Sequence, residues 1–178
     1  MSNRNNLVFK GLYIVAWVIF VGLSIEAGGL IVNFIFSIYK PEFVPNLYQK
    51  LDLSAMYHRS KWTFFGMYSF VLAVSVLKAY LFYIVICLMH KMDLSHPFSR
   101  FVSEEITKIS YCTFSIGILS YISRQTAKNI QHRGYNTDNL NQFWVDSEAF
   151  ILMAAVVYVI ATIFKKGVEI QNENDLTI

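Results

Sequence analysis

The sequence predicts an all-α fold, a single domain over residues 1–178 that forms an integral membrane bundle of four transmembrane helices. Composition is the first indication, because 55% of the residues are hydrophobic and only 15% are charged. Soluble domains usually carry about a quarter charged residues. The mean hydropathy is +0.43. The apolar residues also fall into runs close to the ~20 residues that a helix needs to cross a bilayer.

Each predicted helix follows from one apolar run. The third run is rich in hydroxyl residues, but a helix is still favoured there because a bilayer leaves no other partner for the backbone polar groups. The fourth run is short and is closed by two lysines, beyond which we expect a short cytosolic tail over residues 165–178. The four predicted helices cover residues 12–38, 62–89, 106–124 and 149–164.

The flanks of these runs contain aromatic and basic residues. Trp62 and Trp144 stand at the starts of the second and fourth runs, where we expect their indole rings in the headgroup layer. Lys and Arg residues are equally numerous on the two sides, so the positive-inside rule gives no orientation. Four crossings place the two termini on the same side of the membrane.

Two charged residues interrupt the apolar runs. Glu26 and Lys78 lie near the middle of the first and second runs, which we expect to pack antiparallel. An ionised side chain at the centre of a bilayer costs about 3 kcal/mol on insertion scales, and an ion pair would offset much of this cost. We therefore expect the two side chains to meet.

Small and polar residues continue this pattern at helical spacing. Asn33 shares a stripe with Glu26, and Ser75 lies three residues before Lys78. The third run has a hydroxyl stripe of its own. We expect the first three helices to line a polar interior and the fourth to supply apolar packing. The candidate intramembrane site or clasp comprises Glu26, Lys78, Asn33, Ser75, Ser110 and Thr113.

Two interpretations of these residues stay open. Intramembrane ionisable residues often mark a proton- or ligand-linked site. The alternative is a structural clasp that sets helix register and has no substrate. Catalytic motifs for hydrolase, metalloprotease and phosphate-binding sites are absent from the sequence, so we predict no enzymatic activity, no metal and no cofactor. The net charge of +3 does not indicate direct nucleic-acid binding.

Two stretches resemble a known family. The last fourteen residues, from Lys165-Lys166-Gly167-Val168-Glu169 to Ile178, resemble the C-terminal signature of the YoaS-like family of small bacterial membrane proteins, a domain of unknown function. The stretch His96-Pro97-Phe98-Ser99 resembles the Pro-Phe motif of that family, and the four-span layout is similar.

The resemblance implies a partner. Members are often encoded beside a Cro/CI-like helix-turn-helix regulator, which implies a non-enzymatic regulatory or sensory role at the bacterial inner membrane with both termini cytoplasmic. A small transporter or channel with its site at Glu26 and Lys78 is the alternative, and a homo-oligomer stays open. Acidic and apolar residues alternate in the tail, which could dock on a basic protein surface through Glu169, Glu173, Asp175 and Leu176.

Overall fold

A computed structural model describes residues 3–40, 51, 53–94, 97–144 and 146–175. Every regular element in these residues is helical, as the composition predicts. Four long helices form the body of the fold, and two short helices lie in the connections. The elements are α1 (Asn3–Tyr39), α2 (Ser54–Arg59), α3 (Lys61–Lys91), α4 (Arg100–His132), the 3-10 helix η2 (Asp138–Phe143) and α5 (Ser147–Asp175).

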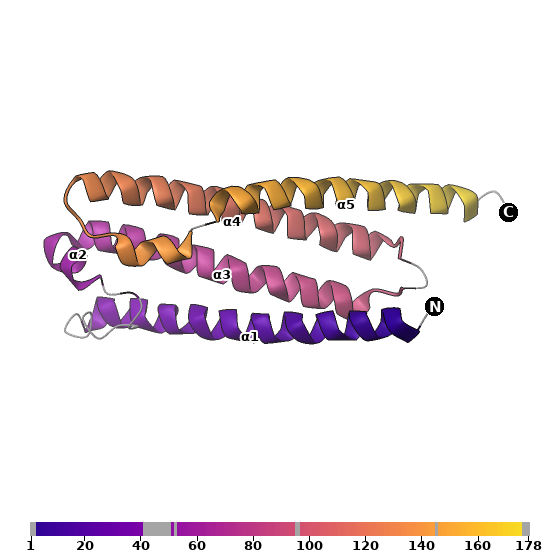
Figure 1. Cartoon of the computed structure of the whole chain (residues 1–178), viewed down its shortest axis with the longest axis horizontal. Coiled ribbons are helices and arrows are strands. Elements are labelled where there is room, and N and C mark those ends of the chain that lie inside the picture. The colour runs from indigo at the N-terminus through magenta and orange to yellow at the C-terminus, as the bar shows by residue number, and fades with distance from the viewer. Residues whose placement is uncertain (1–2, 41–50, 52, 95–96, 145, 176–178) are drawn as a thin grey trace.

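The long helices lie nearly parallel to one axis and are packed in chain order, α1 on α3, α3 on α4 and α4 on α5 (Figure 1). α1 and α3 run antiparallel, with Tyr13 stacked on His90 at one end and Phe34 against Tyr68 towards the other. α1 begins and α5 ends at the same end of the bundle (Figure 1), which we call the terminal end. The other end, which carries α2, is called the α2 end.

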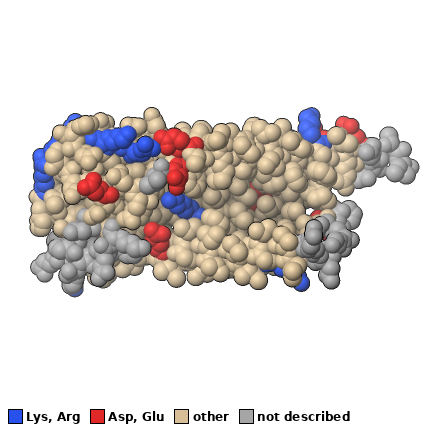
Figure 2. Space-filling view, in the orientation of Figure 1, with Lys and Arg blue, Asp and Glu red and all other residues tan. Residues whose placement is uncertain are grey.

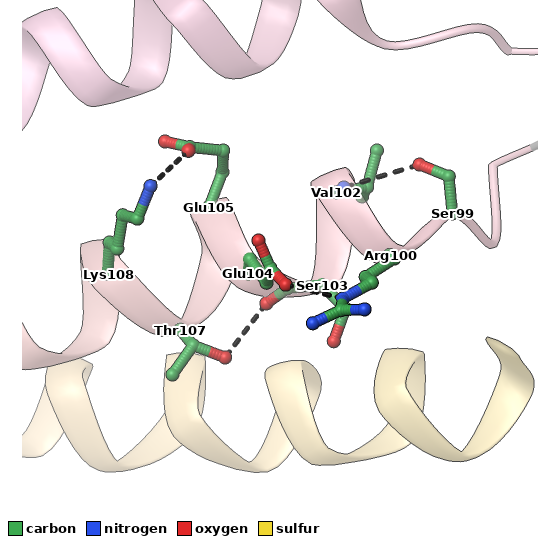
Figure 3. Close-up of polar contacts among 8 residues, drawn as sticks. All are labelled: Ser99, Arg100, Val102, Ser103, Glu104, Glu105, Thr107 and Lys108. Atoms are coloured by element: carbon green, nitrogen blue, oxygen red, sulfur yellow. Dashed lines mark hydrogen bonds and ion pairs between the residues drawn. The ribbon is translucent and has the colours of Figure 1, made fainter. Parts of the chain in front are cut away.

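Serine residues determine where α3 and α4 begin. Ser60 accepts a hydrogen bond of 3.3 Å from the backbone N–H of Thr63. Ser99 accepts one of the same length from the backbone N–H of Val102 (Figure 3). These hydroxyl groups satisfy amide donors that the first turn leaves without a partner. α4 therefore starts six residues before the predicted 106, and it continues beyond 124 to His132.

The outer surface of the bundle is apolar. Leu7–Tyr39, Lys61–Lys91 and Asp138–Glu173 are each long and apolar enough to cross a membrane. Large side chains such as Val18, Ile25 and Leu152 are more than 60% exposed. A soluble bundle would bury such side chains, so this surface is compatible with a membrane protein. The first, second and fourth predicted helices lie within these three segments.

α4 is not among the three apolar segments, because its buried face is rich in hydroxyl groups. Ser103, Ser110, Thr113, Ser120 and Ser123 are all buried. The exposed face of the same helix is apolar and aromatic over its middle turns. This exposed stripe consists of Tyr111, Phe114, Ile118, Tyr121 and Ile122.

α5 begins beside the middle of α4 and not at the end of the bundle (Figure 1). Gly117 of α4 makes this start possible, because a Cβ atom there would lie 2.6 Å from Cγ1 of Ile151 and 3.2 Å from the carbonyl oxygen of Ser147. The preceding segment, η2, folds back into the bundle from the α2 end, where α4 ends (Figure 1). Its residues Leu140 and Phe143 are buried.

The two tryptophans, both predicted to lie in the headgroup layer, differ in the structure, and the prediction is wrong for Trp144. Trp62 is 91% exposed at the surface, whereas Trp144 is only 2% exposed. Trp144 belongs to a hydrophobic core that fills the α2 end together with Tyr57, Phe64 and Tyr68. Since α5 starts deep in the bundle, Trp144, three residues before its start, lies in the core.

Candidate functional site

Lys78 lies beside the break between η2 and α5, at the middle of the bundle. Its ammonium group donates a hydrogen bond of 3.2 Å to the carbonyl oxygen of Phe143, the last residue of η2. The last carbonyl groups of a helix lack partners within the helix and form its negative end. Lys78 therefore supplies both a donor and a positive charge to the end of η2. Its Nζ atom also lies 5.9 Å from the ring centroid of Phe150.

Glu26 lies at the same level of the bundle but does not form the expected ion pair. The contacts between α1 and α3, Phe20 with Tyr83 and Phe34 with Tyr68, place Glu26 level with Lys78. Among the ion pairs of the described residues, none joins these two side chains. Lys78 instead interacts electrostatically with two carboxylates, Glu26 and Asp146. Asp146, which immediately precedes α5, was not predicted from the sequence.

A second pair of charges lies at the start of α5. Arg124 of α4 donates to both carboxylate oxygens of Glu148, at 2.8 and 3.0 Å, and the hydroxyl of Ser147 donates to the same carboxylate. Figure 2 shows acidic and basic side chains gathered on this face, between the middle of the bundle and the α2 end, and others near the terminal end. We call Glu26, Lys78, Arg124, Asp146 and Glu148 the central charge cluster.

The other predicted site residues do not join this cluster. Ser110 donates a hydrogen bond of 2.9 Å to the carbonyl oxygen of Ala154 in α5, and Thr113 donates to Ile109 in its own helix. Ser75 is buried in α3, and Asn33 is half-buried in α1. The hydroxyl stripe of α4 thus faces α5, where it supports helix packing, and does not line an interior with α1 and α3.

The glycines of α1 have open space around them in the structure. A Cβ atom at Gly22, Gly28 or Gly29 would meet nothing within 4 Å. These glycines therefore do not bring α1 close to another helix of the same chain. Close approach within the chain depends on Gly117 and, as described below, on Gly167.

A groove lies between the first third of α4 and residues 158–169 of α5, towards the terminal end. Its volume is about 640 Å³. Arg100 pairs with Glu104 at 2.8 Å beside the groove, and Figure 3 shows these two side chains on the side of α4 that faces α5. The groove is lined by Arg100, Ser103, Glu104, Thr107, Lys108, Tyr111, Tyr158, Ala161, Thr162, Lys165, Val168 and Glu169.

The predicted tail is helical through Asp175, so α5 continues well beyond its apolar run. Glu169 pairs with Lys166 at 2.8 Å, and Glu173 is exposed. Leu176 and the side chain of Asp175 lie outside the described residues. Figure 1 shows that the last turns of α5 project past the other helices.

The two stretches that carry the family resemblance meet in the structure. The ring of Phe98 packs on Phe164, with ring centroids 5.3 Å apart, and covers Gly167. Ser99, the next residue, caps α4. His96, which belongs to the same stretch, lies outside the described residues. The sequence predicts residues 165–178 as a tail beyond the last helix, so it offered no signal for this contact.

In the part of the chain that the structure describes, no group of three His, Cys, Asp or Glu side chains could hold a metal ion. His90 stacks on Tyr13, with ring centroids 6.3 Å apart. Cys112 is buried, and its thiol faces the carbonyl oxygen of Leu77 at 3.6 Å.

Comparison with known proteins identifies the family. Residues 38–178 match a family described as "Protein of unknown function (DUF2975)". Neither the curated proteins nor the solved structures contain a significant match. The matched region holds Lys78, Asp146 and both stretches that meet at Phe98 and Gly167, whereas Glu26 precedes it. Because the match extends over most of its length, the chain belongs to the DUF2975 family of proteins of unknown function.

Proposed function

We propose that the chain is a four-crossing membrane protein of the YoaS-like type, and that it acts as a non-enzymatic sensor or regulator. Two layers of basic residues support the membrane placement. The contacts of Tyr13 with His90, Lys91 with Phe101 and Phe98 with Phe164 bring the four long helices into register at the terminal end. This register aligns Lys10, Lys91, Arg100 and Lys165 in one layer, and Lys40, Lys61 and Lys128 in a second layer.

The separation of these layers fits a bilayer. α3 has 31 residues and reaches from Lys61 in one layer to Lys91 in the other. At 1.5 Å per residue this length is about 45 Å. A bilayer measures about 40–45 Å when its headgroup regions are included. Lys and Arg side chains are well placed at such boundaries because their ammonium and guanidinium groups reach the headgroups.

α4 would form the third crossing, although its overall composition is polar. Its exposed stripe from Tyr111 to Ile122 is apolar and would face lipid, while its hydroxyl groups bond to backbone carbonyl oxygens. Polar groups satisfied in this way support helix packing in a bilayer. The fourth crossing would be discontinuous, with η2 on one side of the break and α5 on the other.

The course of α5 is the observation that carries the proposed function. α5 starts at the central charge cluster, next to Asp146, and runs without interruption to Asp175 at the terminal end. Its 29 residues span about 43 Å. A change in protonation or ligand binding at the cluster would therefore act on the start of a helix whose other end projects into the aqueous phase.

The projecting end of α5 is suited to binding a partner. Residues 169–173 are all exposed, and Ile170 is 58% exposed between the polar residues Glu169 and Gln171. A short helical end without packing is only marginally stable in water, and a partner would stabilise it. Helices of this type commonly dock in a groove of another protein. We propose a cytosolic helix-turn-helix regulator as the partner, with both termini in the cytoplasm of a bacterium and the body in its inner membrane.

Recruitment of the regulator tests this proposal. The full chain would be expressed with the helix-turn-helix protein encoded beside its gene, and the share of that protein in the membrane fraction measured. We expect Ile170→Glu, or a stop after Val168, to release the regulator. Asn129→Glu introduces the same charge on an exposed turn near the α2 end and should have no effect. Recruitment that survives both tail changes, or fails in the unaltered chain, would overturn the proposal.

Coupling to the cluster needs a separate measurement. We expect Lys78→Met to change the recruited share severalfold while the protein still inserts, because the charge at the start of α5 is altered. Ser115→Ala is a suitable control, since this exposed hydroxyl bonds only within α4. If Lys78→Met leaves recruitment unchanged, the cluster is a structural clasp and the sensory part of the proposal fails.

A small transporter or channel is the second candidate, and the break between η2 and α5 favours it. Transporters often build their sites from discontinuous helices near the middle of the bilayer. Proteoliposomes holding a pH-sensitive dye would report proton flux, with Na⁺ and K⁺ gradients as further arms. A flux that the unaltered chain supports, and that Glu26→Gln and Lys78→Met abolish, would favour this function. Flux that is absent, or insensitive to both substitutions, would remove it.

A further inference from the structure

We propose that the groove between α4 and α5 binds one phospholipid, with the headgroup phosphodiester held between Arg100 and Lys165. The volume of about 640 Å³ lies in the usual range for small-molecule sites. Basic pockets between helices at a membrane surface are known to hold lipid headgroups. The inference rests on the proposed membrane placement and is independent of the proposed protein partner.

The register of α4 against α5 brings the two cations together. The hydrogen bond from Ser110 to Ala154 and the packing of Phe98 over Gly167 define an antiparallel pairing of the two helices. In this pairing Arg100 and Lys165 lie at the same level and both line the groove. Like charges that face each other repel, and an anion between them would replace this repulsion with two attractions.

The existing partners of these cations leave room for an anion. Arg100 uses Nε to bond Glu104, and the two side chains are 89% and 54% exposed. Such an exposed pair contributes little to stability, and guanidinium has further N–H donors that can bind phosphate oxygens. Lys165 interacts electrostatically with Glu169 one turn away. The amino end of α4 is also at the groove, and its dipole favours a negative charge there.

The groove is charged at one end and mainly aromatic and apolar at the other, which matches the headgroup and the acyl chains of a lipid. Arg100, Glu104, Lys165 and Glu169 lie towards the terminal end, and Lys108 lies deeper, one turn from Tyr111. Tyr111 and Tyr158, whose ring centroids are 6.2 Å apart, lie towards the middle of the bundle together with Ala161. A headgroup would therefore occupy the charged end, and glycerol and acyl carbons would lie over the tyrosine rings. Free phosphate would use only the charged end.

Neighbouring lysines provide a matched test. The full chain in a neutral detergent would be titrated with dihexanoyl-phosphatidylglycerol, and the bound lipid counted by native mass spectrometry. We expect one lipid per chain, and we expect Lys165→Gln or Arg100→Gln to weaken binding about fivefold each. Lys166→Gln removes the same charge one residue away, outside the groove, and should leave binding unchanged. Equal losses for Lys165→Gln and Lys166→Gln would overturn the proposal.

Two further experiments distinguish binding of a whole lipid from binding of its phosphate alone, and loss of binding from loss of folding. Glycerol phosphate, which has no chains, should bind far more weakly, and equal binding would assign the site to free phosphate and overturn the proposal. Thr162→Trp keeps all charges but fills the groove, and it should abolish binding with an unchanged melting temperature. Retention of the chain in carbonate-washed membranes checks the placement separately, so that a failure there is distinct from a failure of the groove.

Discussion

Phe98 lies so close to Gly167 that a Cβ atom at residue 167 would stand 2.5 Å from Cδ1 of the ring. Phe98 precedes α4 and Gly167 lies in α5, so this contact joins the two helices at the terminal end. It also joins the two stretches that resemble the YoaS-like family. The contact gives a physical reason for the glycine: any side chain at this position would displace the aromatic ring.

Substitution of Gly167 should therefore destabilise the protein. In an exposed helix Gly→Ala stabilises by up to about 1 kcal/mol. Here we expect Gly167→Leu to lower the free energy of unfolding by about 1–2 kcal/mol, because overpacking forces the ring out. Reversible unfolding in mixed micelles would measure this change. In a Phe98→Ala background the same substitution should cost much less, and an additive loss would show that the two residues do not interact.

Gly117 should tolerate substitution less well than Gly167. Its neighbours include backbone atoms, the amide nitrogen of Ile151 at 3.0 Å and the carbonyl oxygen of Ser147 at 3.2 Å from a Cβ atom. Backbone cannot rotate away as a phenyl ring can, so Gly117→Ala should separate α4 from α5 at a cost of about 2–3 kcal/mol. Gly28→Ala, where the added methyl group meets nothing, is the control and should be neutral or stabilising. Similar melting temperatures for Gly117→Ala and Gly28→Ala would contradict this packing.

Lys78 and Glu26 should contribute unequally to stability. Sequence reasoning predicts that removing either charge alone costs more than removing both, because a lone charge would remain. In the structure Lys78 also donates a hydrogen bond to the carbonyl oxygen of Phe143 and interacts electrostatically with Asp146. We therefore expect Lys78→Met to lower the free energy of unfolding by about 2–3 kcal/mol. Glu26→Gln should be nearly neutral, since no ion pair is lost and a mid-bundle charge is removed.

The double variant separates these two predictions. With Lys78 absent, Glu26→Gln restores no partner to Phe143 or Asp146, so the double variant should melt close to Lys78→Met alone. A double variant clearly more stable than Lys78→Met would show that Glu26 and Lys78 form the ion pair that the sequence predicts.

Ser110 and Thr113 offer a matched pair of hydroxyl groups. Both are buried in α4, but Ser110 bonds to α5 and Thr113 bonds within its own helix. Interhelical hydrogen bonds in membrane proteins contribute about 0.6 kcal/mol on average. We expect Ser110→Ala to lose about this amount and Thr113→Val to lose less. Hydrogen exchange at residues 150–158 should rise in Ser110→Ala only, and an equal rise in both variants would contradict the assignment.

The apolar runs of α1, α3 and α5 are visible in the chain because hydropathy and helix length are local properties. A run such as residues 62–89 has few alternatives to a long helix, whatever it packs against. The same locality explains why the sequence predicts Glu26 and Lys78 at the same level of the bundle, where the contacts of α1 with α3 place them. α4 was also predicted, although its bounds were too short, because the caps and polar turns at its ends extend past the hydrophobic part.

The partners of these residues depend on contacts between distant segments. The segment from Asp138 to Phe143 has the composition of a surface loop, yet its Leu140 and Phe143 are buried because Gly117 lets α5 start at mid-bundle. That start brings Phe143 and Asp146 to Lys78, and it turns the hydroxyl stripe of α4 towards α5. Hydropathy records how much apolar surface each segment has to bury. Which face meets which depends on steric fit at a few positions, and the absence of a Cβ atom at Gly117 and Gly167 decides that fit here.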